Sequence, residues 1–358
     1  MLEHQVDSDH DISRKVYVVC GRDTTARDDM YEYLETLGLE SIKKELAVDL
    51  TGEGAPFVGR IIDRALENAQ AIIVLLTGDD VARLREAFWE DNEEGYEKEF
   101  WPQPRQEQIF EAGYAFGRSP KRTILVQVGR IRPFSDIAGR YISNFTEAMA
   151  DREELKNRLR RAGCKLKDSE QIKIEQEENE ERPVDPKKVF VVYGRDKAVR
   201  REVFAFLRGI NLSPIPWNQA VRLTGAGSPF IGEVVEAALS EAQAVVVLLT
   251  GDDEARLRRK YFTKGDSRDE KDLASQPRPN VLFEAGMAFS RLEDRTILVE
   301  LGKLRLCNVL SSRHRIRLSN KLEHRLEFAH SLENAGCAVA LPQNELLRRI
   351  GNFNFTYE

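Results

Sequence analysis

Three features are scarce in this chain of 358 residues, and each scarcity argues against a class of protein. The four cysteines lie at no metal-ligand spacing, and a chain this large needs no disulfides, so a reducing cytoplasm is the simplest compartment. The five histidines form no cluster, which argues against a histidine-bound metal and against a Ser-His-Asp site. The longest apolar runs have only the length of a strand, and residues 1–12 hold no apolar signal core.

Positive charge is not in excess either. The 54 lysines and arginines face 60 acidic residues, which gives a formal net charge of −6. A nucleic-acid surface would need a concentrated basic face, and no segment is suited to a bilayer. We therefore expect neither nucleic acid nor a membrane as a partner.

The sequence does contain a long internal repeat at a constant offset of 173 residues. Three segments of the first copy return in the second: Val16–Asp23 as Val189–Asp196, Thr77–Asp80 as Thr250–Asp253, and Phe110–Gly113 as Phe283–Gly286. A repeat of this length indicates a duplicated domain and not a solenoid. Residues common to both copies have survived their divergence, either for packing or for chemistry.

The repeat divides the chain into five parts: an N-terminal tail (1–14), a first domain (15–166), a linker (167–186), a second domain (187–342) and a C-terminal tail (343–358). The linker is rich in Glu, Gln and Lys and ends in Pro183 and Pro186, which is typical of a charged, exposed connection. In the C-terminal tail, Phe353, Phe355 and Tyr357 alternate, which fits either an edge strand or a docking tail.

The second copy predicts strands that alternate with helices. We expect strands at Val189–Tyr193, Ser213–Trp217, Ala244–Leu249 and Thr296–Leu301, and helices at Lys197–Arg208 and Pro229–Ala242, the latter capped by Ser228. This alternation implies an open parallel sheet with helices on both faces, and a flavodoxin-like order is favoured. Such sheets bind ligands at the carboxyl ends of their strands, where Gly194–Asp196 and Thr250–Asp253 lie.

Glu284 is the most suggestive candidate for chemistry. It is the only ionisable residue within Val281–Phe289, a segment that reads as a nearly apolar helix, and Glu111 occupies the matching place in the first copy. A carboxylate among apolar side chains is costly unless it is paired or faces a cleft, and desolvation of this kind is common at catalytic sites. The alternative is that Glu284 has a structural role. It would then lie on the single solvent-exposed face of an otherwise buried helix and pair with Arg291.

The remaining motifs allow both functional and structural interpretations. Arg195 could clamp a phosphate, whereas Asp196 is better explained as the cap of the next helix. The loop Thr224–Gly227 could receive an anion on free N–H groups, although two glycines before a helix are a weak signal. For Thr250–Asp253, we favour capping of a helix over residues 254–259 to a metal site. Trp217 could stack on a base or fill the core.

Taken together, these segments resemble a known family. Val189–Asp196, Val245–Thr250 and Arg278–Met287 are similar to the bacterial TIR-like domains of predicted nucleotide-binding proteins, which occur as effectors of cyclic-nucleotide anti-phage systems. The resemblance covers Val189 to about Leu341, and more loosely Val16 to about Leu166. It implies two tandem flavodoxin-like (TIR-like) domains.

The resemblance also implies an activity. Active members of the family cleave NAD at the nicotinamide–ribose bond, and their catalytic glutamate matches Glu284; NAD is then the substrate, and no cofactor or metal is implied. We predict substrate contacts in the second domain from Gly194, Arg195, Asp196, Trp217, Thr224, Gly225, Gly227, Thr250 and Asn280. The equivalents in the first domain are Gly21, Arg22, Asp23, Thr51 and Gly52, with Glu111 as the corresponding acid.

Each copy departs from the family pattern in a different segment. The first has Arg105-Gln-Glu-Gln108 where the second has Arg278-Pro-Asn-Val281, and it has Lys44 in place of Trp217. The second lacks the Phe-Ser-Asp-Ile-x-Gly-Arg segment that the first keeps at residues 134–140. We therefore expect specialised copies, one mainly catalytic through Glu284 and one mainly structural or regulatory.

Three functions fit the sequence. The leading hypothesis is a cytoplasmic NAD glycohydrolase that acts in anti-phage defence, and the alternative is a non-enzymatic module that binds a nucleotide or pairs with other TIR domains. A third is a transferase that exchanges the base of NAD through the same carboxylate. TIR–TIR self-association is expected, and because no separate sensor domain is visible, activation is expected from a partner, from self-assembly or from binding within one copy.

Overall fold

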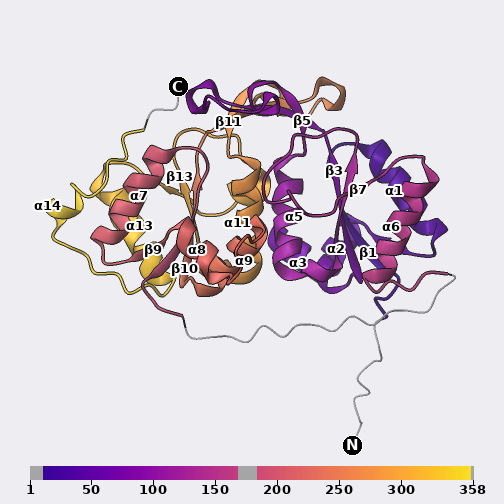
Figure 1. Ribbon diagram of the computed structural model, residues 1–358, viewed down its shortest axis with the longest axis horizontal. Helices are drawn as coiled ribbons and strands as arrows, with labels where there is room; N and C mark the ends of the chain where they lie inside the picture. The colour runs from indigo at the N-terminus through magenta and orange to yellow at the C-terminus, as the bar shows by residue number, and fades with distance from the viewer. Residues whose placement is uncertain (1–10, 168–183, 356–358) are drawn as a thin grey trace, which may run out of the picture.

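The computed structural model of the protein describes residues 11–167 and 184–355. Most of the predicted linker and of the N-terminal tail therefore lies outside the described residues. The described chain forms two α/β domains side by side, with helices α5 and α11 between them and a small sheet across the top (Figure 1). The predicted fold class, two tandem parallel-sheet domains with helices on both faces, is confirmed.

The first domain is built on one parallel sheet. Its strands are β1 (Lys15–Val19), β2 (Glu40–Ile42), β3 (Ala71–Thr77), β6 (Thr123–Val128) and β7 (Ser143–Asn144). Its helices are α1 (Thr24–Thr36), α2 (Lys44–Asp49), α3 (Val58–Glu67), α4 (Gly95–Lys98), α5 (Gln106–Arg118) and α6 (Met149–Arg161). The order β2-β1-β3-β6-β7 is the flavodoxin-like one. Every residue of the central strand β3 is buried, because helices cover both faces of the sheet.

The second domain repeats this plan. Its strands are β8 (Lys188–Val192), β9 (Ser213–Ile215), β10 (Ala244–Leu249), β13 (Thr296–Glu300) and β14 (Ile316–Arg317), in the order β14-β13-β10-β8-β9. Its helices are α7 (Lys197–Gly209), α8 (Trp217–Leu223), α9 (Ile231–Glu241), α10 (Arg268–Lys271), α11 (Pro279–Leu292), α12 (Asn308–Ser311), α13 (Leu322–Asn334) and α14 (Asn344–Leu347). The strand predicted at residues 244–249 is confirmed at both ends.

Two predicted element boundaries are wrong by two residues for local reasons, and the other predicted ends differ from the structure by at most one residue. The second strand ends at Ile215 and not at Trp217 because Pro216 has no N–H to donate to a sheet and instead precedes α8. Helix α9 begins after Phe230 and not after Ser228. The Glu233 carboxylate accepts a hydrogen bond from the Phe230 N–H at 2.9 Å, which satisfies the start of the helix at that point.

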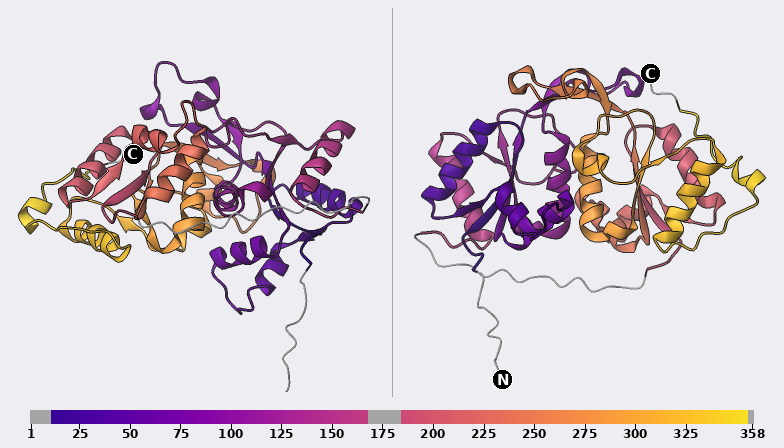
Figure 2. Two further views of the ribbon diagram at one scale, coloured as in Figure 1. Left: turned by 60° about the horizontal axis from the view of Figure 1, so that its bottom comes forward. Right: turned by 180° about the vertical axis from the view of Figure 1, so that it is seen from behind.

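A third sheet joins the two domains. It contains β12 (Ala274–Gln276), β11 (Asp253–Leu257), β4 (Asp80–Leu84) and β5 (Trp101–Gln103), in that order and antiparallel. Its central pair, β4 and β11, comes from different domains, and this sheet bridges them in the view from behind as well (Figure 2). The helix predicted after Thr250–Asp253 is therefore wrong, because those residues enter a strand that pairs with the other copy.

Helices α5 and α11 form the second joint, and they cross at a pair of equivalent glycines. A Cβ atom added to Gly113 would overlap the carbonyl of Phe283, and one added to Gly286 would overlap the carbonyl of Phe110. Only glycine permits two helix backbones to approach this closely. One continuous apolar core fills this region and includes Phe110 and Phe283. The glycine of the repeated Phe-Glu-Ala-Gly motif is thus explained by packing between domains.

The C-terminal tail docks on the outer face of the second domain. Phe353 is buried, with its ring 5.8 Å from that of Phe206 on α7. The guanidinium of Arg325 on α13 donates to the carbonyl of Gly351 at 2.8 Å, which holds the tail in place. No strand forms over residues 343–355, so the docking interpretation is confirmed there, whereas Tyr357 lies outside the described residues.

Among the residues that the structure describes, no helix combines the length and the apolar character needed to cross a membrane.

The glycine crossing predicts a sharp difference between two identical substitutions. Gly286→Ala should lower the free energy of unfolding by about 1–3 kcal/mol, because the added methyl group forces α5 and α11 apart. Gly227→Ala, which meets nothing within 4 Å, should leave it nearly unchanged. Urea denaturation of both full-length variants tests this, and equal midpoints would contradict the proposed crossing.

Candidate functional site

The two acids of the Thr-Gly-Asp-Asp motif have separate structural roles. The first, Asp79 or Asp252, accepts a hydrogen bond at 2.5 Å from the backbone N–H of Arg22 or Arg195 and so fixes the turn after the first strand of its own domain. The turn glycine, Gly194, lies directly against the Asp252 carboxylate, which fills the space that a side chain would need. Burial raises the pKa of Asp252 to about 6.

The second acid belongs to a buried ion-pair network between the domains. Asp253 forms an ion pair at 2.5 Å with Arg132 of the first domain, and Asp80 forms the matching pair at 2.8 Å with Arg305 of the second. The N-cap arginines of α5 and α11 make equivalent pairs: Arg105 binds Glu270 at 2.7 Å, and Arg278 binds Glu97 at 2.5 Å. The stability of the interface depends on both members of each pair, because removing one partner would leave a buried charge without compensation.

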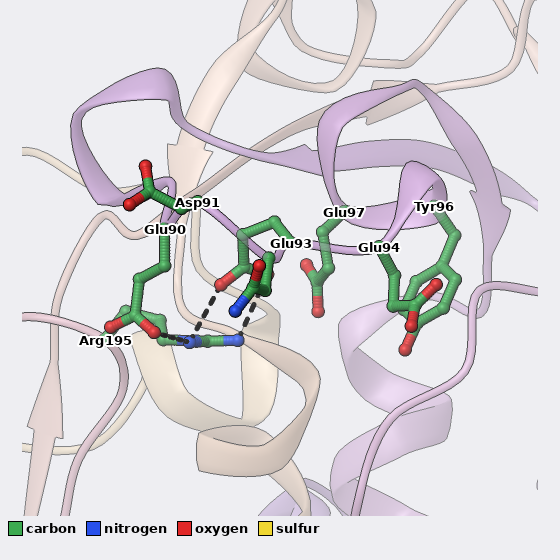
Figure 3. A pocket seen from close by; sticks show the side chains of 8 residues that line it. Glu90, Asp91, Glu93, Glu94, Tyr96, Glu97 and Arg195 are labelled. Atoms are coloured by element: carbon green, nitrogen blue, oxygen red, sulfur yellow. Dashed lines mark hydrogen bonds and ion pairs between the residues drawn. The ribbon is translucent and has the colours of Figure 1, made fainter.

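Arg195 lies in an acidic pocket of about 480 Å³ between the domains (Figure 3). Its guanidinium forms ion pairs with Glu93 at 3.0 Å and Glu90 at 3.7 Å, both from the first domain. The pocket is lined by Glu90, Asp91, Asn92, Glu93, Glu94, Tyr96, Glu97 and Arg195. A phosphate bound to Arg195 would have to displace two carboxylates and enter a strongly negative site.

The first domain repeats this arrangement at Arg22, which forms an ion pair at 2.9 Å with Asp266 of the second domain. The adjacent Asp23 accepts a hydrogen bond at 2.5 Å from the Tyr261 hydroxyl, again from the second domain. Asp23 and Asp196 also accept hydrogen bonds from the first N–H groups of α1 and α7, as predicted for helix caps. Each Gly-Arg-Asp turn is thus covered by a loop of the other domain.

Glu284 lies elsewhere on the interface, on α11, and its closest ionisable neighbour comes from the first domain. Its carboxyl is within hydrogen-bonding reach of the Asp136 carboxyl. Burial and the adjacent acid raise the pKa of Glu284 well above its ordinary value, and burial likewise raises the pKa of Asp136. The alternative partner, Arg291, binds Glu236 at 2.6 Å and the Gly117 carbonyl instead.

Asn280, one turn before Glu284, reaches the same segment of the first domain. Its side-chain amide donates hydrogen bonds to the Ser135 hydroxyl and to Oδ2 of Asp136. Asp136 is only 1% exposed, whereas Glu284 is partly accessible to solvent. Among the described residues no lysine or arginine forms an ion pair with Glu284. The result is a carboxyl pair with no lysine or arginine bound to Glu284 among the described residues.

Glu111 on α5 has a different environment. The Tyr17 hydroxyl donates to its carboxylate at 3.4 Å, and burial raises its pKa to about 7, partly offset by the nearby Lys44 ammonium. The position equivalent to Asp136 in the second domain is Val309, which is buried and apolar. Glu111 therefore lacks a carboxyl partner from the other copy.

The other predicted substrate residues are dispersed. The loop from Thr224 to Gly227 is largely exposed, and the Thr224 hydroxyl is engaged with the Val221 carbonyl at 2.7 Å. Gly225 adopts a left-handed conformation with φ of 67°, as does Gly52 in the first domain, where the Thr51 hydroxyl makes the equivalent bond to Val48. Trp217 is 39% exposed at the start of α8. Their contacts with a substrate stay predictions.

The sequence missed Ser135 and Asp136 as members of the Glu284 site. The segment Phe134–Arg140 stood out as a family-like stretch of the first copy, but the sequence offered no sign that it reaches across to the second copy. That placement follows from the α5–α11 crossing, which brings the carboxyl ends of both sheets to one interface.

Parallel five-stranded sheets in the order described, each with a glutamate at the equivalent position of the helix that joins the two copies, define a two-domain TIR-like protein. Comparison with known families agrees: the family described as CAP12/Pycsar effector protein, TIR domain, matches the chain twice, over residues 15–147 and 188–320. The chain belongs to this family, as a tandem duplication. No curated protein matches the chain.

The carboxyl pair predicts a pH-dependent stability that depends on Glu284. Because the pKa values of Glu284 and Asp136 are raised in the folded protein, the fold holds a proton that the unfolded chain releases. Their contribution is full below about pH 4, where the unfolded acids are protonated, and is lost as pH rises through the raised values. Glu284→Gln should therefore gain on the order of 1–3 kcal/mol over wild type at pH 8, with a smaller difference at pH 5.

Chemical denaturation of wild type and Glu284→Gln at both pH values measures this effect. Glu147→Gln is the matched control, because the Glu147 side chain is 97% exposed and should change stability at neither pH. A Glu284→Gln variant that is less stable than wild type at pH 8 would show that Glu284 supports the fold.

Proposed function

We propose that the protein cleaves NAD at the nicotinamide–ribose bond and acts as an effector in anti-phage defence, with Glu284 as the catalytic carboxylate. The observation that carries this proposal is Glu284, a partly buried residue whose carboxyl is desolvated, lies against a second acid and pairs with no lysine or arginine among the described residues. Membership of a TIR effector family supports the same activity.

The chemistry suits a lone carboxylate. As the bond between the nicotinamide nitrogen and ribose C1′ breaks, nicotinamide leaves with the electron pair as a neutral base, so no general acid is needed. The ribose becomes an oxocarbenium ion, which a carboxylate stabilises electrostatically or captures directly. Water then adds to C1′ and loses a proton, which gives ADP-ribose. A carboxylate in a poorly hydrated site stabilises this cation more strongly than one in bulk water.

The structure makes the scaffold alternative the weaker one. The other side chains of the repeated motifs serve the fold: the arginines and aspartates pair across the interface, and the glycines permit the helix crossing. Glu284 forms no such stabilising pair, and its raised pKa works against stability at neutral pH. A costly acid retained at both aligned positions is better explained by chemistry than by packing.

The two copies are proposed to divide the work. Glu284 lies in the domain that keeps the Arg278-Pro-Asn segment, whereas the neighbours of Glu111 are Lys44, Tyr17 and Glu107, all from its own copy. The ammonium of Lys44 would disfavour a substrate that becomes cationic in this site. The first domain is therefore assigned a structural or regulatory role.

Release of free nicotinamide from NAD tests the proposal. Purified full-length protein should release it, and Glu284→Gln should lower kcat by on the order of 100-fold or more, because electrostatic stabilisation of the transition state is lost. The assay is run over a range of protein concentrations, so that any dependence on self-association is seen.

Glu111→Gln distinguishes the roles of the two copies. Full activity of Glu111→Gln beside an inactive Glu284→Gln would support division of labour, and equal losses would refute it. Binding of NAD without nicotinamide release at any concentration would favour the scaffold. Excess pyridine base, with a search for the exchanged dinucleotide, separates hydrolysis from base exchange.

A further inference from the structure

The segments that each copy has kept come together at one place. The first copy retains residues 134–140 and the second retains residues 278–287, and Asn280 of the second donates to Ser135 and Asp136 of the first. Glu284 meets Asp136 at the same point. The two family-like segments, which lie in different domains of this chain, thus meet at a single site.

The segments that each copy has changed also come together, at Glu111. The altered Gln106 of the first copy accepts a hydrogen bond at 3.1 Å from the backbone N–H of Cys307 in the altered segment of the second. The Cys307 thiol is buried near Glu111, and Val309 stands where the equivalent of Asp136 would be. The two segments that depart from the family resemblance therefore meet at one site, and the two that keep it meet at the other.

We propose that Asp136 of the first domain is a positioning residue for Glu284 of the second, so that the chain holds one composite active site assembled from both copies. The inference rests on the proposed function of Glu284 and adds a residue that acts on it from the other domain.

The hydrogen bonds around Asp136 explain how it would act. Asp136 Oδ2 accepts from Asn280, whereas the buried Oδ1 accepts from no N–H or O–H group among the described residues. A proton shared between the Asp136 and Glu284 carboxyls fixes the orientation of the Glu284 carboxyl. Arg140 is the cation near Asp136, and it is itself shared with Glu233 and Glu236 of α9.

The first test measures NAD cleavage by Asp136→Asn against pH. Asparagine keeps the shape but cannot share a proton, so kcat should fall on the order of 10- to 100-fold through loss of orientation. Removing the second negative charge lowers the pKa of Glu284. The acid limb of the kcat–pH profile should therefore shift to lower pH by about one pH unit or more. Asp63→Asn is the control, because Asp63 is likewise hydrogen-bonded, to Tyr114 at 2.7 Å, but lies outside the site.

Three outcomes would overturn the proposal. A fall in kcat with an unmoved acid limb would make Asp136 merely structural, and a rise in activity would mean that it blocks Glu284. Mixing full-length Asp136→Asn with full-length Glu284→Gln should restore no activity, since both residues must lie in one chain. Recovery on mixing would place the composite site between chains instead.

A second measurement does not depend on catalytic activity. It therefore distinguishes failure of the positioning role from failure of the proposed NAD cleavage. The stabilities at pH 8 of Glu284→Gln, Asp136→Asn and the double variant form a double-mutant cycle. Either single change relieves the carboxyl pair, so the double variant should gain no more than one single variant does. Additive gains would show that the two carboxyls do not interact and would overturn the positioning role. If the cycle is coupled but wild type releases no nicotinamide, the NAD proposal alone fails.

Discussion

The close crossing of α5 and α11 is the constraint on which the rest of the structure depends. Because Gly113 and Gly286 allow backbone to meet backbone, the two sheets face a common apolar core and their carboxyl ends come together. The pairing of β4 with β11 and the arginine–carboxylate pairs follow from that approach. Glu284 lies two residues before Gly286 on the same helix, so the crossing also determines which residues this acid contacts.

The fold could be read from the sequence because its signals are local. A fully apolar run such as Ala244–Leu249 predicts a buried parallel strand in any context, and its observed bounds agree. The motif Thr250–Asp253 was misread because its partners lie in the other copy, on β4 and at Arg132. Side-chain contacts across a pseudo-twofold interface leave no spacing pattern in a single sequence, and Asp136 was missed for the same reason.

The tandem arrangement also removes a restriction that identical subunits obey. In a symmetric homodimer every substitution appears at both equivalent sites, so a change that weakens one weakens the other. Within one chain, Val309 can replace an acid on one side while Asp136 remains on the other. The segment around Arg195 shows the same freedom, since the loop that covers it is far more acidic than the loop that covers Arg22.

The shared sheet has a consequence for synthesis of the protein. Strand β4 is made long before its partner β11, so the first domain leaves the ribosome with an unpaired inner strand edge and with the apolar face of α5 uncovered. Exposed edges and apolar faces of this kind invite association with other chains. The nascent first half is therefore prone to association with other chains. This risk ends only when about 100 further residues of the second copy have been translated and have folded onto it.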